Sequence, residues 1–226
     1  MTLLCLTGLT KSFGGLMAVN EVSFDVPEGA VVGLIGPNGA GKTTVFNLIT
    51  GNHRADRGTV LFEGRDITRW RTHRIVKLGI ARTFQTIRLF QNLSVLENVL
   101  AGCHCRMRSG PAAAMLRLPG ERREEKASLE RALAELAFVG LAGQEMQLAK
   151  NLSYGSQRLL EIARALATEP KLVILDEPAG GMNEQETAAL IGTIGRIRQR
   201  GITTLLIEHD MALVMKACER IVVLEY

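Results

Sequence analysis

The segment Gly36-Pro37-Asn38-Gly39-Ala40-Gly41-Lys42-Thr43 constrains the fold of this chain more than any other feature. It fits the pattern G-x-x-x-x-G-K-[ST] and lies between an apolar run, residues 30–35, and a stretch of helical character that opens near Lys42. Its glycines let successive N–H groups point at phosphate oxygens, and a helix N-terminus adds positive potential at the same place. The sequence therefore predicts a phosphate-binding loop between a strand and a helix.

The chemistry expected of this loop is that of nucleotide binding. Lys42 would reach the β- and γ-phosphates of ATP, and the Thr43 hydroxyl would ligate Mg²⁺. A glycine-rich turn without a ligand is the alternative, and the complete pattern with its strand and helix flanks argues against it.

Phosphoryl transfer also needs a carboxylate near the metal, and Asp176-Glu177 supplies one directly after the apolar run of residues 172–175. Asp176 would hold Mg²⁺ through its water shell, and Glu177 would polarise the attacking water as general base. A solvated cap at a plain strand end is the alternative for such a pair. Because Asp176-Glu177 occurs in a chain that also has a phosphate loop, the catalytic interpretation of this pair is favoured.

Short apolar runs and helical patterns alternate on both sides of a helical stretch. The pair Ser94 and Glu97 has the spacing of a capping box, and residues 121–138 carry apolar positions at helical spacing before Gly140. This alternation predicts an α/β core with parallel strands, interrupted by a helical insertion over about residues 89–152. Strands are expected at residues 22–26, 30–35, 59–62, 172–175, 203–207 and 221–224, and a further helix at residues 184–200.

Composition excludes several classes of protein. With 46% hydrophobic and 22% charged residues among 226, the chain is expected to fold as one packed unit. The net charge of +4 is compatible with nucleotide, nucleic acid or a lipid surface and does not choose among them. Neither a run of about 18 apolar residues nor a secretory signal is present, so a soluble cytoplasmic chain is expected. The four cysteines suggest neither a disulfide framework nor a zinc site. Cys103-His104-Cys105 looks like part of a metal-ligand cluster, but the sequence offers no second group of ligands to complete it.

Two further segments lead to weaker expectations. Residues 106–123 hold five arginines but no interleaved aromatic residues for base stacking, so a solvated loop or a subunit contact is favoured over a nucleic-acid surface. The chain stops at Tyr226 directly after an apolar run. We therefore expect that a C-terminal tail is missing.

A third motif separates this chain from kinases, GTPases, helicases and recombinases. Leu152-Ser153-Tyr154-Gly155-Ser156-Gln157, followed by a helical stretch to Leu166, resembles the signature motif of the ABC ATPase family. The resemblance implies that Ser153 and the Gly155 backbone present donors to the γ-phosphate of an ATP held by the opposite subunit. Two chains would then close head to tail around two ATP molecules, with Ser153, Tyr154, Gly155, Ser156 and Gln157 forming the signature site.

The other motifs of that family follow in order. Gln85 in Arg82-Thr83-Phe84-Gln85 matches the glutamine that contacts Mg²⁺, His209 matches the switch histidine at the γ-phosphate, and Phe13 matches the aromatic residue that stacks on adenine. Together the motifs give Glu177, His209 and Lys42 as catalytic residues and Thr43, Gln85 and Asp176 as the Mg²⁺ site. ATP binding is assigned to Phe13, Val19, Gly36, Pro37, Asn38, Gly39, Ala40, Gly41, Lys42, Thr43 and Thr44.

The resemblance also implies an architecture. It is that of a P-loop NTPase with a RecA-like parallel-sheet core, an antiparallel β subdomain and an inserted α-helical subdomain. Residues 1–88 and 153–226 would form the ATP-binding core of one ABC ATPase domain, and about residues 89–152 the helical subdomain.

Two departures from the family pattern narrow the resemblance. Tyr154 occupies a signature position that is usually glycine, and Asn183 ends a loop where many relatives have aspartate. Asn183 can still form a hydrogen bond across a dimer interface but carries no charge. These two departures, taken together with four further segments, resemble the ATPases of branched-chain amino-acid importers, particularly the LivG type. The four segments are residues 19–22, 82–85, 179–183 and 207–211. That resemblance runs from about Lys11 to the last residue, and such relatives continue for some tens of residues further.

The function expected from the resemblance is ATP hydrolysis that energises amino-acid import. The partners would be a second ABC ATPase subunit, identical or different, two membrane permease subunits and, indirectly, a binding protein outside the membrane. The chain would lie at the cytoplasmic face of a bacterial inner membrane. Import of urea, amides or other amino acids, and lipopolysaccharide export, remain alternatives. An ATPase acting on nucleic acid or ribosomes is disfavoured because long coiled-coil insertions and a tandem domain are lacking. A non-catalytic subunit is disfavoured because Glu177, Lys42 and His209 are present.

Overall fold

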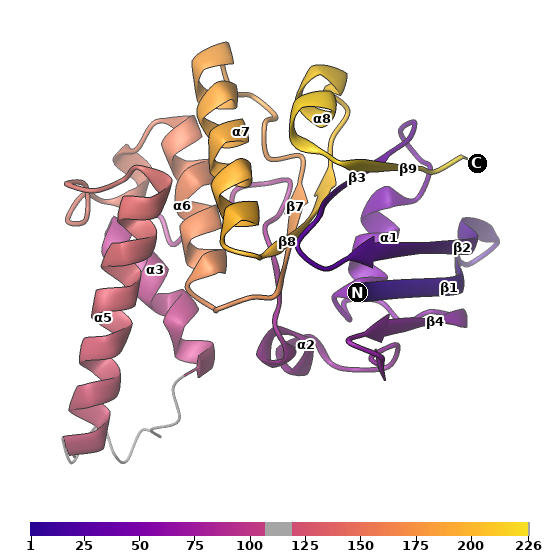
Figure 1. Ribbon diagram of the computed structural model, residues 1–226, viewed down its shortest axis with the longest axis horizontal. Helices are drawn as coiled ribbons and strands as arrows, with labels where there is room; N and C mark the ends of the chain where they lie inside the picture. The colour runs from indigo at the N-terminus through magenta and orange to yellow at the C-terminus, as the bar shows by residue number, and fades with distance from the viewer. Residues whose placement is uncertain (107–118, 226) are drawn as a thin grey trace. The chain divides into compact units, whose positions relative to one another are not determined.

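The computed structural model describes residues 1–106 and 119–225 of the chain. Contacts divide it into two compact units, one formed by Met1–Gln85 with Lys171–Tyr226 and the other by Thr86–Pro170 (Figure 1). The division differs from the expected one, because residues 153–170 group with the inserted helices and not with the nucleotide-binding core. Of the predicted basic stretch, Arg108 and Arg117 lie outside the described residues.

The first unit contains a five-stranded sheet in the order β6-β7-β8-β3-β9. All of its neighbouring strands are parallel, which confirms the predicted α/β core. Every residue of β7 and β8 is buried, as is typical of central parallel strands, and in both the apolar residues are consecutive in the sequence. The bounds are β3 Val31–Ile35, β6 Ile80–Arg82, β7 Leu172–Asp176, β8 Thr203–Ile207 and β9 Arg220–Val223. The helices of this unit are α1 Lys42–Ile49, α2 Thr72–Leu78, α7 Glu184–Gln199 and α8 Met211–Ala217.

A four-stranded antiparallel sheet, in the order β2-β1-β4-β5, belongs to the same unit. Its strands are β1 Thr2–Phe13, β2 Leu16–Pro27, β4 Arg57–Phe62 and β5 Arg65–Asp66. The sequence did not predict β1, because its register shifts disturb the alternation of buried and exposed residues: Leu3 and Leu4 are both buried, and Gly8 takes a φ of 58°. The expected antiparallel β subdomain is present.

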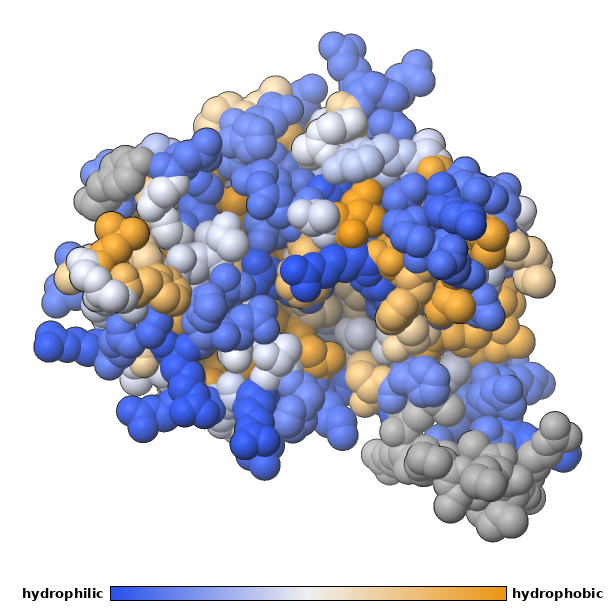
Figure 2. All heavy atoms as spheres, turned by 180° about the vertical axis from the view of Figure 1, so that it is seen from behind, coloured by the Kyte–Doolittle hydropathy of each residue, from blue (hydrophilic) through white to orange (hydrophobic). Residues whose placement is uncertain are grey.

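The excess of positive charge is concentrated in one part of this unit. Residues 54–77 hold seven basic and three acidic side chains, a difference equal to the net charge of +4 of the whole chain. Arg57, Arg65 and Arg74 are among the exposed side chains of this segment. Figure 2 shows strongly hydrophilic side chains along the lower left of the face that is seen from behind.

The second unit is helical. Its elements are α3 Val95–Cys103, η1 His104–Arg106, α5 Pro119–Val139, η2 Ala149–Asn151 and α6 Tyr154–Leu166. Ser94 and Glu97 form the predicted capping box at the start of α3, and Gly140 follows α5 with a φ of 85°. Gly102 lets α3 approach α6 closely, since a Cβ there would lie 2.3 Å from the Arg164 carbonyl oxygen. Helix α6 packs against both α3 and α5, which explains why it groups with them.

Three smaller observations complete the fold. Cys103 is buried and its thiol donates to the Ser128 carbonyl, Cys105 donates to the Gly102 carbonyl, and His104 is exposed. Within the described part of the chain, no group of three or more histidine, cysteine, aspartate or glutamate side chains comes together. No helix among the described residues is long and apolar enough to cross a membrane.

Candidate nucleotide-binding site

The phosphate loop connects β3 to α1, as the sequence predicted. Gly39 and Gly41 have φ values of 91° and 85°, a region that side chains with a Cβ rarely adopt. A Cβ at Gly41 would lie 2.2 Å from the Ala18 carbonyl oxygen and 3.1 Å from Val19 Cγ2. The loop therefore passes directly against Val19, one of the predicted ATP-binding residues.

The N-terminus of α1 is suited to an anion. Gly41 offers no side chain to cap the helix, and the first turn contains no acidic residue. The first N–H groups of the helix and the positive end of its dipole thus face the loop without a neutralising carboxylate from that turn. The residues present fit the phosphates of a nucleotide.

Lys42 lies at the centre of the loop and is 8% exposed. Its ammonium donates to the carbonyl oxygens of Gly36 at 2.7 Å and of Pro37 at 2.9 Å. Thr43 and Asn38, by contrast, are exposed on the same segment. The loop therefore holds its lysine in place with its own carbonyl groups.

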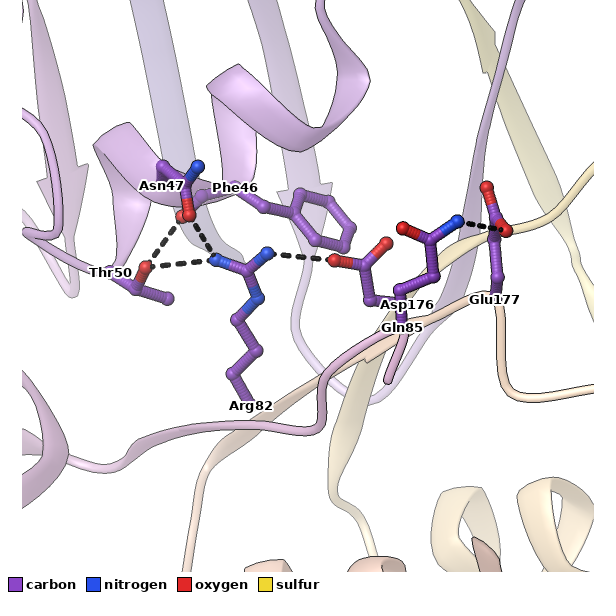
Figure 3. Close-up of polar contacts among 7 residues, drawn as sticks. All are labelled: Phe46, Asn47, Thr50, Arg82, Gln85, Asp176 and Glu177. Atoms are coloured by element: carbon purple, nitrogen blue, oxygen red, sulfur yellow. Dashed lines mark hydrogen bonds and ion pairs between the residues drawn. The ribbon is translucent and has the colours of Figure 1, made fainter. Parts of the chain in front are cut away.

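Asp176, at the end of β7, is held by a residue that the sequence did not single out. Arg82, the last residue of β6, forms an ion pair with it at 2.7 Å, with the two side chains 7% and 3% exposed (Figure 3). The same guanidinium donates to Asn47 Oδ1 at 2.7 Å and lies 5.2 Å from the Phe84 ring. The only signal in the sequence was a lone arginine at the end of a short apolar run.

Glu177 is placed by its backbone and by Gln85. Its φ of 47° is unusual for a residue other than glycine, and such backbone strain gathers at functional sites. The Glu177 N–H donates to the Ile207 carbonyl at 3.0 Å, and the Gln85 amide donates to the Glu177 carboxylate at 2.8 Å (Figure 3). The structure thus brings two predicted site residues into direct contact.

Oxygen donors of the kind that Mg²⁺ prefers occur at this site. The Thr43 hydroxyl, the Asp176 carboxylate and the Gln85 amide oxygen are hard ligands, and all three residues belong to the same unit. By chemical type these donors fit a magnesium ion bound together with nucleotide phosphates, and in this structure the Asp176 carboxylate is paired with Arg82.

His209 and Phe13 lie at the ends of two strands of this unit. His209 follows β8 and is exposed. Phe13 ends β1, is 42% exposed, and makes an edge contact with His53 at a centroid distance of 5.1 Å. The Lys11 ammonium lies 5.4 Å from the centroid of the same ring. A partly exposed aromatic ring at this position is able to stack on a base.

The signature residues belong to the helical unit. Ser153 is the N-cap of α6, and its hydroxyl accepts the Ser156 N–H at 3.2 Å. The expectation that this motif opens a helix is confirmed. Asn183 in turn caps α7 and forms a capping box with Glu186, so its side chain has a role within its own chain.

Tyr154, the departure from glycine, is anchored by charged residues that the sequence did not predict. Its hydroxyl accepts from Arg158 at 3.0 Å, and Arg158 pairs with buried Glu161 at 3.3 Å. Glu161 also accepts the Arg88 N–H at 2.7 Å. Burial raises the pKa of the Glu161 carboxyl, against the opposing effects of this N–H group and of the two neighbouring arginines, Arg158 and Arg164.

Comparison with known proteins agrees with this geometry. The model of the ABC transporter family matches residues 19–180. The chain is 45% identical over 222 residues to the high-affinity branched-chain amino acid transport ATP-binding protein LivG of Salmonella typhimurium, a match that covers 98% of this chain and 87% of the relative. It is 44% identical over 219 residues to the corresponding protein BraF of Pseudomonas aeruginosa, covering 96% and 86%.

Solved structures lead to the same family. The ADP conformation of an ATP-binding cassette of an ABC transporter superposes with a TM-score of 0.87 at 35% identity, over 99% of this chain and 87% of that one. A dimeric post-hydrolysis state of another cassette, bound to ADP and Pi, gives a TM-score of 0.81 at 26% identity, over 98% and 94%. The family match and the near full-length identity lead to one conclusion: this chain belongs to the ABC transporter family, as one of its ATP-binding cassettes.

Proposed function

We propose that this chain is the ATP-hydrolysing subunit of an importer for branched-chain amino acids. The observation that carries the proposal is the combination of a complete set of nucleotide-site residues with near full-length identity to proteins named for branched-chain amino acid transport. In this assignment Lys42 and the phosphate loop bind the phosphates of ATP. Glu177 is the general base that accepts a proton from the attacking water.

The remaining site residues orient the reaction. Gln85 holds the Glu177 carboxylate, as its hydrogen bond at 2.8 Å supports. Thr43, Gln85 and Asp176 would hold Mg²⁺, which when bound neutralises charge on the β- and γ-phosphates. His209 would contact the γ-phosphate, and Phe13 with Val19 would contact the adenosine.

The working unit is a dimer in this proposal. Dimeric cassettes occur among the similar structures, one of them described as a post-hydrolysis state with ADP and Pi. Ser153 and the N-terminus of α6 would face the γ-phosphate held by the other subunit, and ATP binding would draw the two subunits together. Hydrolysis would then let them separate.

Ser153→Arg tests this cross-subunit role. The variant should bind ATP with the affinity of the parent chain, because its own phosphate loop is unchanged. It should fail to dimerise with ATP, and its rate of hydrolysis should fall at least about tenfold, since a bulky cation replaces a small donor at the helix N-terminus. Size-exclusion chromatography with ATP in a Glu177→Gln background measures the dimer. Normal dimerisation of the double variant would contradict the role of Ser153.

Two membrane permease subunits complete the proposed transporter, with this chain at the cytoplasmic face of the inner membrane. The segment after Gln85 is our candidate contact. Within it Arg88 and Phe90 are exposed, whereas Leu89 is 9% exposed and packs inside the helical unit. A binding protein outside the membrane would deliver the amino acid, and no nucleic acid takes part.

An uptake assay tests the cargo. Cells that lack this chain should lose high-affinity uptake of labelled leucine, isoleucine and valine. The parent chain should restore this uptake. Lys42→Ala should not restore it, because its phosphate loop lacks the ammonium. Labelled urea serves as the control cargo. Restored urea uptake without restored leucine uptake would contradict branched-chain amino acids as the cargo while leaving the ATPase assignment intact.

A further inference from the structure

A buried carboxylate that no motif assigned lies between the loops that follow β7 and β8. Glu208 is 1% exposed and comes directly after β8. One carboxylate oxygen accepts the Ala179 N–H at 2.9 Å, and the other accepts the His209 N–H at 3.2 Å. The same side chain therefore joins the residue two positions after Glu177 to the histidine of the next loop.

A second bond ties the two loops together at the same place. The Glu177 N–H donates to the Ile207 carbonyl at 3.0 Å, one residue before Glu208. The loop carrying Glu177 is thus attached to the end of β8 through its backbone and, two residues further on, through the Glu208 side chain. The position of His209 relative to Glu177 depends on this pair of attachments.

Burial makes an ionised carboxylate at position 208 energetically unfavourable unless N–H groups donate hydrogen bonds to it. Burial raises the pKa of the Glu208 carboxyl, whereas the backbone N–H groups of Ala179, His209 and Asp210 and the His209 side chain lower it. Cys218 faces the same region: its burial, and then the Glu208 carboxylate, raise the pKa of the thiol to about 11. A buried carboxylate that is kept in place by two backbone donors fixes the geometry of both loops.

We propose that Glu208 is a positioning residue for ATP hydrolysis: anchored by Ala179, it holds His209 in place against the loop that carries Glu177. The inference rests on the proposed roles of Glu177 and His209. It adds a residue that acts through His209 and touches neither nucleotide nor metal.

Glu208→Gln is the main test. An amide keeps one acceptor but turns an N–H group toward one of the two backbone donors, so the His209 loop should lose its fixed position. We expect kcat for ATP hydrolysis to fall about tenfold while the KM for ATP stays within about twofold, and Glu208→Ala to lower kcat further.

The matched control is Glu219→Gln, at the opposite end of the same sheet. Glu219 accepts the Val31 N–H at 3.4 Å and pairs with Arg198, so its substitution also removes a carboxylate from a backbone donor. Its kcat should remain within about twofold of the parent value. A kcat for Glu208→Gln equal to that of this control would overturn the proposal.

A double-mutant cycle separates positioning from plain stabilisation. In a His209→Ala background, Glu208→Gln should lower the single-turnover rate by less than about twofold, because the group it positions is gone. A full tenfold loss in that background would show that Glu208 acts independently of His209 and would overturn the proposal. The parent chain and Lys42→Ala are assayed alongside: absence of hydrolysis by the parent would contradict the ATPase assignment, and with it the role of Glu208.

Discussion

Glu177→Gln is expected to reduce steady-state ATP hydrolysis by at least about 100-fold, within the range that a general base contributes. The substitution keeps the size of the side chain and one oxygen but removes the carboxylate that, in the proposed function, accepts the proton of the attacking water. It leaves the phosphate loop and the Lys42 ammonium unchanged, so ATP affinity should stay within a few-fold of the parent value. Phosphate release and equilibrium binding of a fluorescent ATP analogue measure the two quantities.

The same variant should accumulate an ATP-bound dimer, because in the proposed cycle ATP binding draws the subunits together and the hydrolysis step that separates them would be blocked. Lys42→Ala is the control, since it should lose ATP affinity and therefore remain monomeric at the same nucleotide concentration. Hydrolysis by Glu177→Gln at the parent rate would remove Glu177 from the role of base. A monomeric, ATP-saturated Glu177→Gln would instead contradict the closure step.

Arg82→Ala should destabilise the chain by roughly 3–5 kcal/mol, the range found when one partner of a buried ion pair is removed. The loss is large because Asp176, 2% exposed, would be left as an unpaired buried carboxylate. Asn47 would also lose a hydrogen bond of 2.7 Å, and the guanidinium contact with the Phe84 ring would disappear. Urea unfolding of the chain without nucleotide measures the change.

The matched control is Arg220→Ala. Arg220 pairs with Asp25 at 2.8 Å, but these side chains are 47% and 41% exposed, so the cost should be about 1 kcal/mol or less. Equal losses for the two variants would show that burial of the Arg82 pair does not decide its contribution. Arg82→Lys should give an intermediate loss, because an ammonium keeps the charge but cannot bond Asp176 and Asn47 with the geometry of a guanidinium.

The sequence predicted the elements whose pattern is local. The phosphate loop, the fully buried strands β7 and β8, the capping box at Ser94 and the helix after the signature all depend on residues within a few positions of one another. Strand β1 was missed because its register shifts disturb the alternation, and the grouping of α6 with α3 and α5 depends on packing between helices that are separate in the sequence. The family resemblance and the α/β fold are confirmed by the comparisons.

The partners of the predicted site residues were harder to find than the residues themselves. Arg82 and Asp176 are 94 positions apart, Gln85 and Glu177 are 92 apart, and Glu208 reaches Ala179 across 29. A single chain without aligned relatives carries no signal for such pairs. The motifs identify the groups that would contact nucleotide, and only the fold shows which side chains hold them.

The two carbonyl oxygens around the Lys42 ammonium have a consequence for turnover. In the proposed function, an incoming phosphate would exchange with these oxygens and would not meet a bare cation, so its net affinity would be the difference between two sets of contacts. On product release the ammonium would return to the carbonyl oxygens of its own loop. By competing with the phosphates in this way, the loop would weaken retention of the spent nucleotide and favour its release before the next cycle.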